Sequence, residues 1–150
     1  MAALHLVIAE ATAVSPEGRI THDDLGIWKD DHIDFLSRIT SFIEEQNAVP
    51  GIQLAHAGRK ASHHSPWKGG KALQPHEAPW QTLAPSAIPF KEAEATPAAM
   101  SRQQIQQVIH DFGSAAIRAG KAGFKIMEIH AAHGYLLNEF MCLSSNQRTG

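Results

Sequence analysis

The chain has 150 residues, of which 43% are hydrophobic and 19% charged, and its formal net charge at pH 7 is −2. These values are typical of one folded domain with an apolar core, and they exclude a disordered chain. The scattered charges argue against a nucleic acid or a membrane surface as a partner, and no apolar run reaches the roughly 18–20 residues that span a bilayer. The single cysteine, Cys142, excludes an internal disulfide, so we expect a reducing, cytoplasmic location.

Two apolar strands flank an amphipathic helix in the first third of the chain. The β-branched run 4–11 does not alternate, which predicts a strand buried on both faces. Asp30 is the expected N-cap of a helix that ends near Asn47, and 50–56 is the second expected strand. The helix carries one apolar stripe, formed by Ile33, Leu36, Ile39, Phe42 and Ile43. A strand, a helix and a strand at this separation predict a right-handed βαβ unit with parallel strands.

The segment 61–100 differs from the rest of the chain because it contains six of the eight prolines and no sustained periodicity. A connection of this length inside a compact domain is usually a functional loop or lid. After it, Ser101 and Gln104 form a capping box that predicts a second long helix, and Gly123 suits the position just past its end. The expected inner face of this helix carries Ile105, Val108, Ile109, Phe112, Ala116 and Ala119.

The third expected strand, 124–130, is followed by a short helical turn at 135–140. Strict alternation places two sets of side chains on opposite faces: Phe124, Ile126, Glu128 and His130 on one, and Met127 and Ile129 on the other. Because the second set is wholly apolar, we expect it to pack against helices. Glu128 and His130 would then point into the interior of a sheet or barrel. The order of elements is that of an α/β protein.

The end of the third strand carries unusual chemistry, because His130, His133 and Tyr135 follow one another closely. Active sites of α/β folds lie at the carboxyl ends of strands. Two imidazoles there can hold one carbonyl or phenolate oxygen, can ligate a metal, or can be satisfied by backbone carbonyls. A metal site needs a third ligand, for which the candidates are Glu128, His56 and His63.

Gln53 gives a second signal, since an amide at a buried strand position is costly unless its polar atoms are paired. It therefore indicates either a polar ligand or pairing with the neighbouring backbone.

Six segments carry a family resemblance, and they occur in this order: 10–14, 18–20, 24–28, 53–60, 130–137 and 146–149. Together they resemble the Old Yellow Enzyme family of flavin-dependent ene-reductases. The chain is most similar to the subgroup often described as NADPH dehydrogenases or xenobiotic reductases. The resemblance extends over essentially the whole chain and rests on several motifs in register.

The resemblance implies a TIM (β/α)8 barrel that binds FMN at the carboxyl ends of its strands. NADPH or NADH would reduce the flavin, which passes hydride to the C=C bond of an enone or a similar activated alkene. His130 and His133 would hold the oxygen of this small-molecule substrate, without a metal, and Tyr135 would be the proton donor. Gln53 would hydrogen-bond the pyrimidine edge of the flavin, and the backbone at Ala11 would lie against it. A homo-oligomer is possible for the full-length family.

A complete barrel needs about 250 residues, whereas this chain supplies about three parallel strands, two main helices and the proline-rich loop 61–100. The strands correspond to the family's second, third and fourth, and the family's later flavin-binding arginine and phosphate-binding loops are not present. We therefore expect 1–150 to be a fragment of a single FMN-binding TIM-barrel domain. Two alternatives stay open: a truncated remnant that neither binds FMN tightly nor catalyses, and a metal hydrolase using His130, His133 and Glu128.

Overall fold

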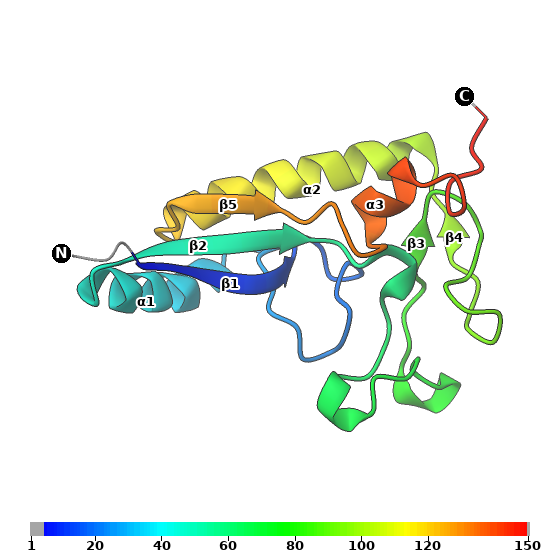
Figure 1. The fold of residues 1–150 in the computed structure, drawn as a ribbon, viewed down its shortest axis with the longest axis horizontal. Coiled ribbons are helices and arrows are strands. Elements are labelled where there is room, and N and C mark those ends of the chain that lie inside the picture. Colours follow the sequence, from blue (N-terminus) through cyan, green and yellow to red (C-terminus); the bar gives the residue numbers. More distant parts are fainter. Residues whose placement is uncertain (1–4, 150) are drawn as a thin grey trace.

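A three-stranded parallel sheet with helices packed on one face forms the body of the molecule (Figure 1). The computed structural model describes residues 5–149. The strands are β1 (His5–Ala13), β2 (Ala48–Ala55) and β5 (Ile126–Ile129), with β2 in the middle. The helices are α1 (His32–Glu45), α2 (Arg102–Lys121) and α3 (Leu136–Met141). The predicted α/β fold with three parallel strands is confirmed, although β5 is shorter than the predicted range.

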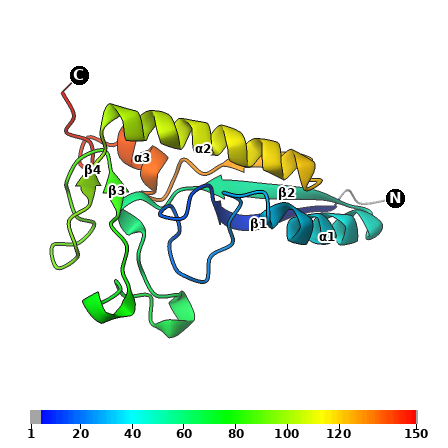
Figure 2. The same cartoon turned by 180° about the vertical axis from the view of Figure 1, so that it is seen from behind.

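The parallel register decides which side chains share a face of the sheet. Gln53 of β2 pairs with Glu128 of β5, so these two polar side chains lie on the same face. Ile52 and Leu54, which alternate with Gln53, are buried on the opposite face. There they join a core with side chains of both long helices: Leu36, Ala115 and Ala119. Figures 1 and 2 show α1 and α2 covering this face, and Glu128 points away from it as predicted.

The outer strands are less buried than the sequence predicts. In β1, an edge strand, Leu6, Val7 and Ile8 are 41–49% exposed, so the prediction of burial on both faces is wrong. Met127 and Ile129 of β5 are also exposed. The end of the Met127 side chain still lies near α2, since a Cβ added at Gly120 would be 3.7 Å from Met127 Cε. A strand at an edge of the described sheet has neighbours on one side only, which leaves its side chains accessible.

Phe124 does not follow the alternation predicted for 124–130. It precedes β5, its N–H donates to the carbonyl of Ala119, and its ring is buried in the core on the helix side. Alternation holds only within an extended strand, and the strand begins at Ile126.

Helix α1 begins without a side-chain cap. The residue at the N-cap position is Asp31, while the carboxylate of Asp30 accepts a hydrogen bond from Arg118 Nε at 2.7 Å. The prediction of Asp30 as the cap is therefore wrong, because a partner on α2 engages it. Phe42 is 62% exposed and does not belong to the buried stripe. Its place is taken by Thr40, whose hydroxyl donates to the carbonyl of Ala122.

Helix α2 begins as predicted, since Ser101 and Gln104 make both hydrogen bonds of a capping box. It ends as predicted, with Gly123 at a φ of +96° just past the C-cap. Its inner face is shifted, because Ile109 is 59% exposed and Ala115 is buried instead. Within residues 5–149 no helix has the length and apolar character needed to cross a membrane.

The long segment 61–100 contains structure that the sequence does not predict. It forms two single turns of 3-10 helix, η2 (Pro66–Lys68) and η3 (Pro75–Glu77). Two short strands, β3 (Leu83–Ala84) and β4 (Ala98–Ala99), pair in parallel. Both are only two residues long, too short for a periodic pattern.

Candidate active site

The turns that follow β2 and β5 lie side by side at the carboxyl edge of the sheet. The N–H of His130 donates to the carbonyl of Leu54, and the N–H of Leu136 donates to the carbonyl of His56. These two hydrogen bonds join the ends of adjacent parallel strands, where the sequence predicts the functional residues.

The structure brings His130, His133 and Tyr135 together. The centre of the His130 ring lies 5.1 Å from that of His133 and 4.8 Å from that of Tyr135, and both contacts are nearly perpendicular. His130 is buried, whereas His133 is exposed and Tyr135 is partly buried. The predicted grouping of these residues thus has a compact geometry.

The hydrogen bond at Nδ1 assigns the tautomer of His130. The N–H of Ala132 donates to this atom at 3.3 Å, so the neutral ring carries its proton on Nε2. Burial lowers the pKa of His130, and the charge of a protonated His133 lowers it further, against a smaller opposing effect of Glu128. His130 is therefore a neutral imidazole whose Nε2–H can donate a hydrogen bond.

The backbone between the histidine pair and Tyr135 adopts two successive left-handed residues. The φ angles are +57° at His133 and +71° at Gly134, and the first is uncommon for a residue with a side chain. Lys60 Nζ donates to the carbonyl of His133 at 2.6 Å, and the Gly134 N–H donates to Asn138 Oδ1 at 2.9 Å. Sequence reasoning assigned Lys60 no role, although it lies in the motif 53–60.

Tyr135 and Ala11 line the same narrow crevice, together with Ala13, Gly18, Ile20, Asp24, Ala55 and Ala57. Burial raises the pKa of the Tyr135 hydroxyl, and the nearby carboxylate of Asp24 raises it further. The hydroxyl therefore keeps its proton at neutral pH. In β1 the register shifts between Ala9 and Thr12, so Glu10 and Ala11 have no paired residue in β2. Such bulges are common beside active sites, where they redirect the backbone.

Gln53 is only partly buried, so the premise of a buried amide is wrong. Its Nε2 donates to Glu128 Oε1 at 2.6 Å, which means that its partner is a side chain and not the neighbouring backbone. The pair lies on the sheet face that the helices leave uncovered.

The candidate third ligands of a metal do not join the histidine pair. His56 is buried, its Nδ1 accepts the N–H of Gly58, and burial lowers its pKa to about 4. The ring of His63 contacts the carbonyl of Ala61 and the carboxylate of Glu94. In the described residues 5–149, no three His, Cys, Asp or Glu side chains are placed to hold a metal ion.

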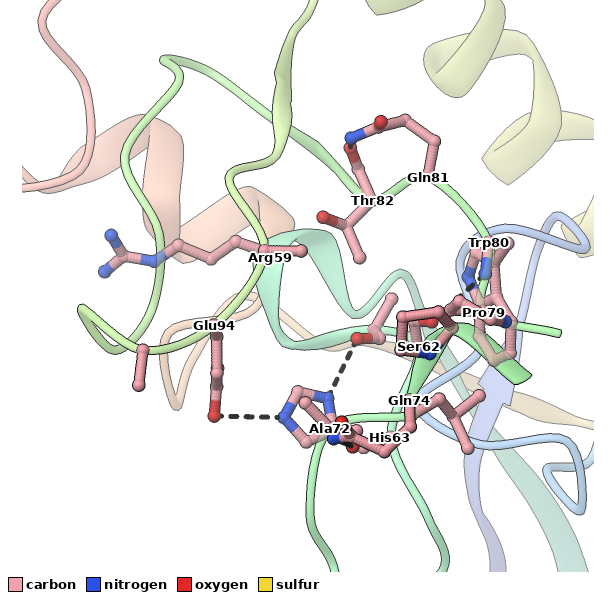
Figure 3. A pocket seen from close by; sticks show the side chains of 15 residues that line it. Arg59, Ser62, His63, Ala72, Gln74, Pro79, Trp80, Gln81, Thr82 and Glu94 are labelled. Atoms are coloured by element: carbon pink, nitrogen blue, oxygen red, sulfur yellow. Dashed lines mark hydrogen bonds and ion pairs between the residues drawn. The ribbon is translucent and has the colours of Figure 1, made fainter. Parts of the chain in front are cut away.

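A cavity of about 390 Å³ lies apart from these residues, in the segment 61–100 (Figure 3). Arg59, His63 and Glu94 line it, as do Trp80 and Thr82. Of the candidate site residues, His63 lines the cavity, whereas His130, His133, Tyr135, Gln53 and Ala11 are not among its lining residues. The length of 61–100 indicates a functional loop, but periodicity does not predict the cavity, because its walls come from irregular backbone.

Comparison with known proteins identifies the relatives of this chain. Residues 1–150 match the family described as the NADH:flavin oxidoreductase / NADH oxidase family. The chain is 49% identical over 149 residues to an NADPH dehydrogenase of Bacillus cytotoxicus and 48% identical over 144 residues to one of Bacillus subtilis. These alignments cover 99% and 96% of this chain, but only 39% and 38% of the two relatives.

Solved structures show the same relation. Morphinone reductase matches with a TM-score of 0.81 at 30% identity, over 96% of this chain and 40% of its own. An Old Yellow Enzyme from a Pichia species matches with a TM-score of 0.80 at 32% identity, over 97% and 38%. The prediction of a partial barrel of the Old Yellow Enzyme type is thus confirmed, and the chain spans about two fifths of the length of these relatives. It belongs to the NADH:flavin oxidoreductase / NADH oxidase family.

Proposed function

We propose that this chain supplies the substrate-holding part of an FMN-dependent NAD(P)H oxidoreductase of the ene-reductase type. NADPH or NADH is the reductant, and the substrate is an enone or a similar activated alkene. Family membership and the NADPH dehydrogenases among the relatives support the oxidoreductase class. The observation that carries the finer proposal is the neutral His130, with its proton on Nε2, beside His133.

The two imidazoles hold the carbonyl oxygen of the substrate. When hydride arrives at the β-carbon of an enone, negative charge develops on that oxygen, and N–H donors already in place stabilise it. A neutral His130 donates a hydrogen bond without giving up its proton. This suits a residue that holds the substrate oxygen and does not act as the proton donor of the reaction. Its lowered pKa keeps it in this form.

Tyr135 completes the addition by giving a proton to the α-carbon, so that hydride and proton together convert the C=C bond into a single bond. Its raised pKa means that the hydroxyl is protonated before the reaction. Its ring lies against the ring of His130, which supports the assignment of both residues to the same substrate.

FMN, when bound, supplies the hydride. Gln53 and the backbone at Ala11 are the residues of this chain that we assign to it. The contact with Glu128 fixes the orientation of the Gln53 amide, whose second N–H and carbonyl can serve a ligand. The bulge at Ala11 suits a backbone contact with a flat ring. Residues 1–150 would accordingly be part of a single FMN-binding domain.

The test uses the purified chain with FMN, NADPH and 2-cyclohexen-1-one under anaerobic conditions, followed by loss of the enone. We expect FMN-dependent consumption of the enone, and a drop of about 100-fold or more in His133→Ala, the scale for loss of one oxyanion donor. His110→Ala is the matched control, because His110 lies exposed on α2, and it should retain activity. A chain that neither binds FMN nor consumes the enone would overturn the proposal and favour the inactive remnant.

A further inference from the structure

Glu139 is a buried acidic residue on the short helix α3, and the mechanism above does not use it. The residue is 1% exposed, and its Oε1 accepts the backbone N–H of Arg59 at 2.9 Å. Arg59 is the middle residue of the 3-10 turn η1 (Gly58–Lys60), which follows β2. The carboxyl group thus joins α3 to η1, beside the predicted site.

Gly58 shows how closely the turn and the carboxyl group fit. Its φ is +61°, and a Cβ added there would lie 2.2 Å from Glu139 Oε1. A side chain at this position would therefore collide with the carboxyl group and would also adopt a strained backbone conformation. The turn can approach Glu139 only because residue 58 is glycine.

The other end of the turn reaches the histidine pair. Lys60 Nζ donates to the carbonyl of His133, and a Cβ added to Gly134 would lie 3.3 Å from Lys60 Cε and Nζ. Lys60 therefore packs against His133 and Gly134, the two left-handed residues whose backbone sets the direction of the His133 side chain and of the chain entering Tyr135. Such backbone persists only where the surrounding structure holds it.

The contribution of Glu139 to the stability of the fold does not by itself explain why a carboxyl group is buried at position 139. Glu139 Oε2 is buried and has no hydrogen-bond partner in the described part of the chain, and burial of an unpaired polar atom costs free energy. Burial also raises the pKa of Glu139 to about 7, against the opposing effects of the Arg59 N–H and the charges of Arg59 and Lys60. An apolar side chain would avoid this cost but could not accept the Arg59 N–H.

We propose that Glu139 is a positioning residue for the histidine pair. It holds η1 by accepting the backbone N–H of Arg59, and η1 in turn places Lys60 where its Nζ donates to the carbonyl of His133. Glu139 touches no reacting atom in this scheme. The effect of Glu139 on catalysis rests on the proposed function, whereas the hydrogen bonds from Glu139 to Arg59 and from Lys60 to His133 do not depend on it.

The test compares Glu139→Ala with Glu139→Gln by NMR of the ¹⁵N-labelled chain. Glu139→Ala removes the acceptor, so exchange of the Arg59 amide hydrogen should rise about tenfold or more. The Gly134 amide signal should shift, and the His130 ring signals should shift as the neighbouring His133 ring moves. Glu139→Gln keeps the acceptor and the volume and should preserve all three readouts. Glu45→Ala, at the exposed end of α1, is the control and should change none.

Lys60→Met keeps the test decisive if Glu139→Ala fails to fold. It removes the donor to His133 while keeping the packed alkyl chain, so it should reproduce the changes at Gly134 and His130. Unchanged Gly134 and His130 signals in Lys60→Met would overturn the proposal, as would a Glu139→Gln variant no better than Glu139→Ala. No readout requires FMN, so absence of enone reduction would count against the proposed function alone.

Discussion

On the helix-covered face of the sheet, Ile52 and Leu54 are buried among apolar side chains of α1 and α2. The buried residues in the turns after β2 and β5 and on the short helix α3 include the polar residues His56, His130 and Glu139. The first region is stabilised by removal of apolar surface from water, a contribution that does not depend on pH. The second consists of polar groups whose cost of burial depends on their protonation state.

Residues close together in the sequence therefore meet opposite demands, since one is buried as apolar surface and the other as a polar group. Leu54 and His56 are two residues apart, yet one contributes to the core and the other is a buried base with an unpaired Nε2 in the described structure. Buried polar groups are tolerated when the surrounding fold holds them in place. A substitution in one region should therefore leave the structure of the other region intact. Three measurements of unfolding free energy test how the regions differ.

The largest effect is expected at the core. Leu54→Ala should lower the free energy of unfolding by about 2–5 kcal/mol, because it removes buried methyl groups and leaves a cavity. Urea denaturation of the chain measures the change, which should be the same at pH 5 and pH 7. Leu143→Ala is the control, since Leu143 is 90% exposed, and should change stability by less than about 0.5 kcal/mol. A similar small loss in Leu54→Ala would contradict the packing described for this face.

The buried titratable groups should give two opposing dependences of stability on pH. His56 has a folded pKa of about 4, below its ordinary 6.5, so the unfolded state binds more protons and stability falls as the pH drops from 6.5 to 4. Glu139 has a folded pKa of about 7, above 4.5, so the folded state binds more protons and stability falls as the pH rises from 4.5 to 7. Each effect amounts to about 3 kcal/mol at full extent, and the two slopes cancel between pH 4.5 and 6.5.

Variants separate the two dependences. Glu139→Gln should leave stability rising with pH below 6.5, whereas His56→Asn, which keeps an acceptor for the Gly58 N–H, should leave it falling above 4.5. The measured quantity is the difference in unfolding free energy from the parent chain at each pH, which cancels the other titrating groups. Parallel curves for parent and variants would show that neither group has the shifted pKa described here.

The smallest effect is expected on the uncovered face. A double-mutant cycle of Gln53→Ala and Glu128→Ala should give a coupling free energy of about 0.2–1 kcal/mol, the range for exposed cross-strand pairs. Chemical denaturation of the four proteins supplies the value. A coupling of several kcal/mol would contradict the description of this face as one that the helices leave uncovered.

Particular residues show which structural features the sequence predicts correctly and which it does not. The capping box at Ser101 and the terminal Gly123 were predicted correctly, because both depend on residues within one helical turn. The prediction that Phe42 and Ile109 are buried is wrong, because the apolar stripe of each helix is wider than its contact surface and its margins lie in solvent. In the site, the sequence predicts the grouping of His130, His133 and Tyr135 because they lie within six residues of one another.

The features that can be predicted from the sequence are therefore local: strand and helix types, the cap of α2, and a histidine pair with a tyrosine at a strand end. The partners of Gln53, Asp30, His133 and Glu139 follow from the folded structure, because they lie 75, 88, 73 and 80 residues away in the chain. The physical reason is that periodicity shows which side of an element is buried, whereas a contact between distant residues depends on sheet register and on the path of the connections.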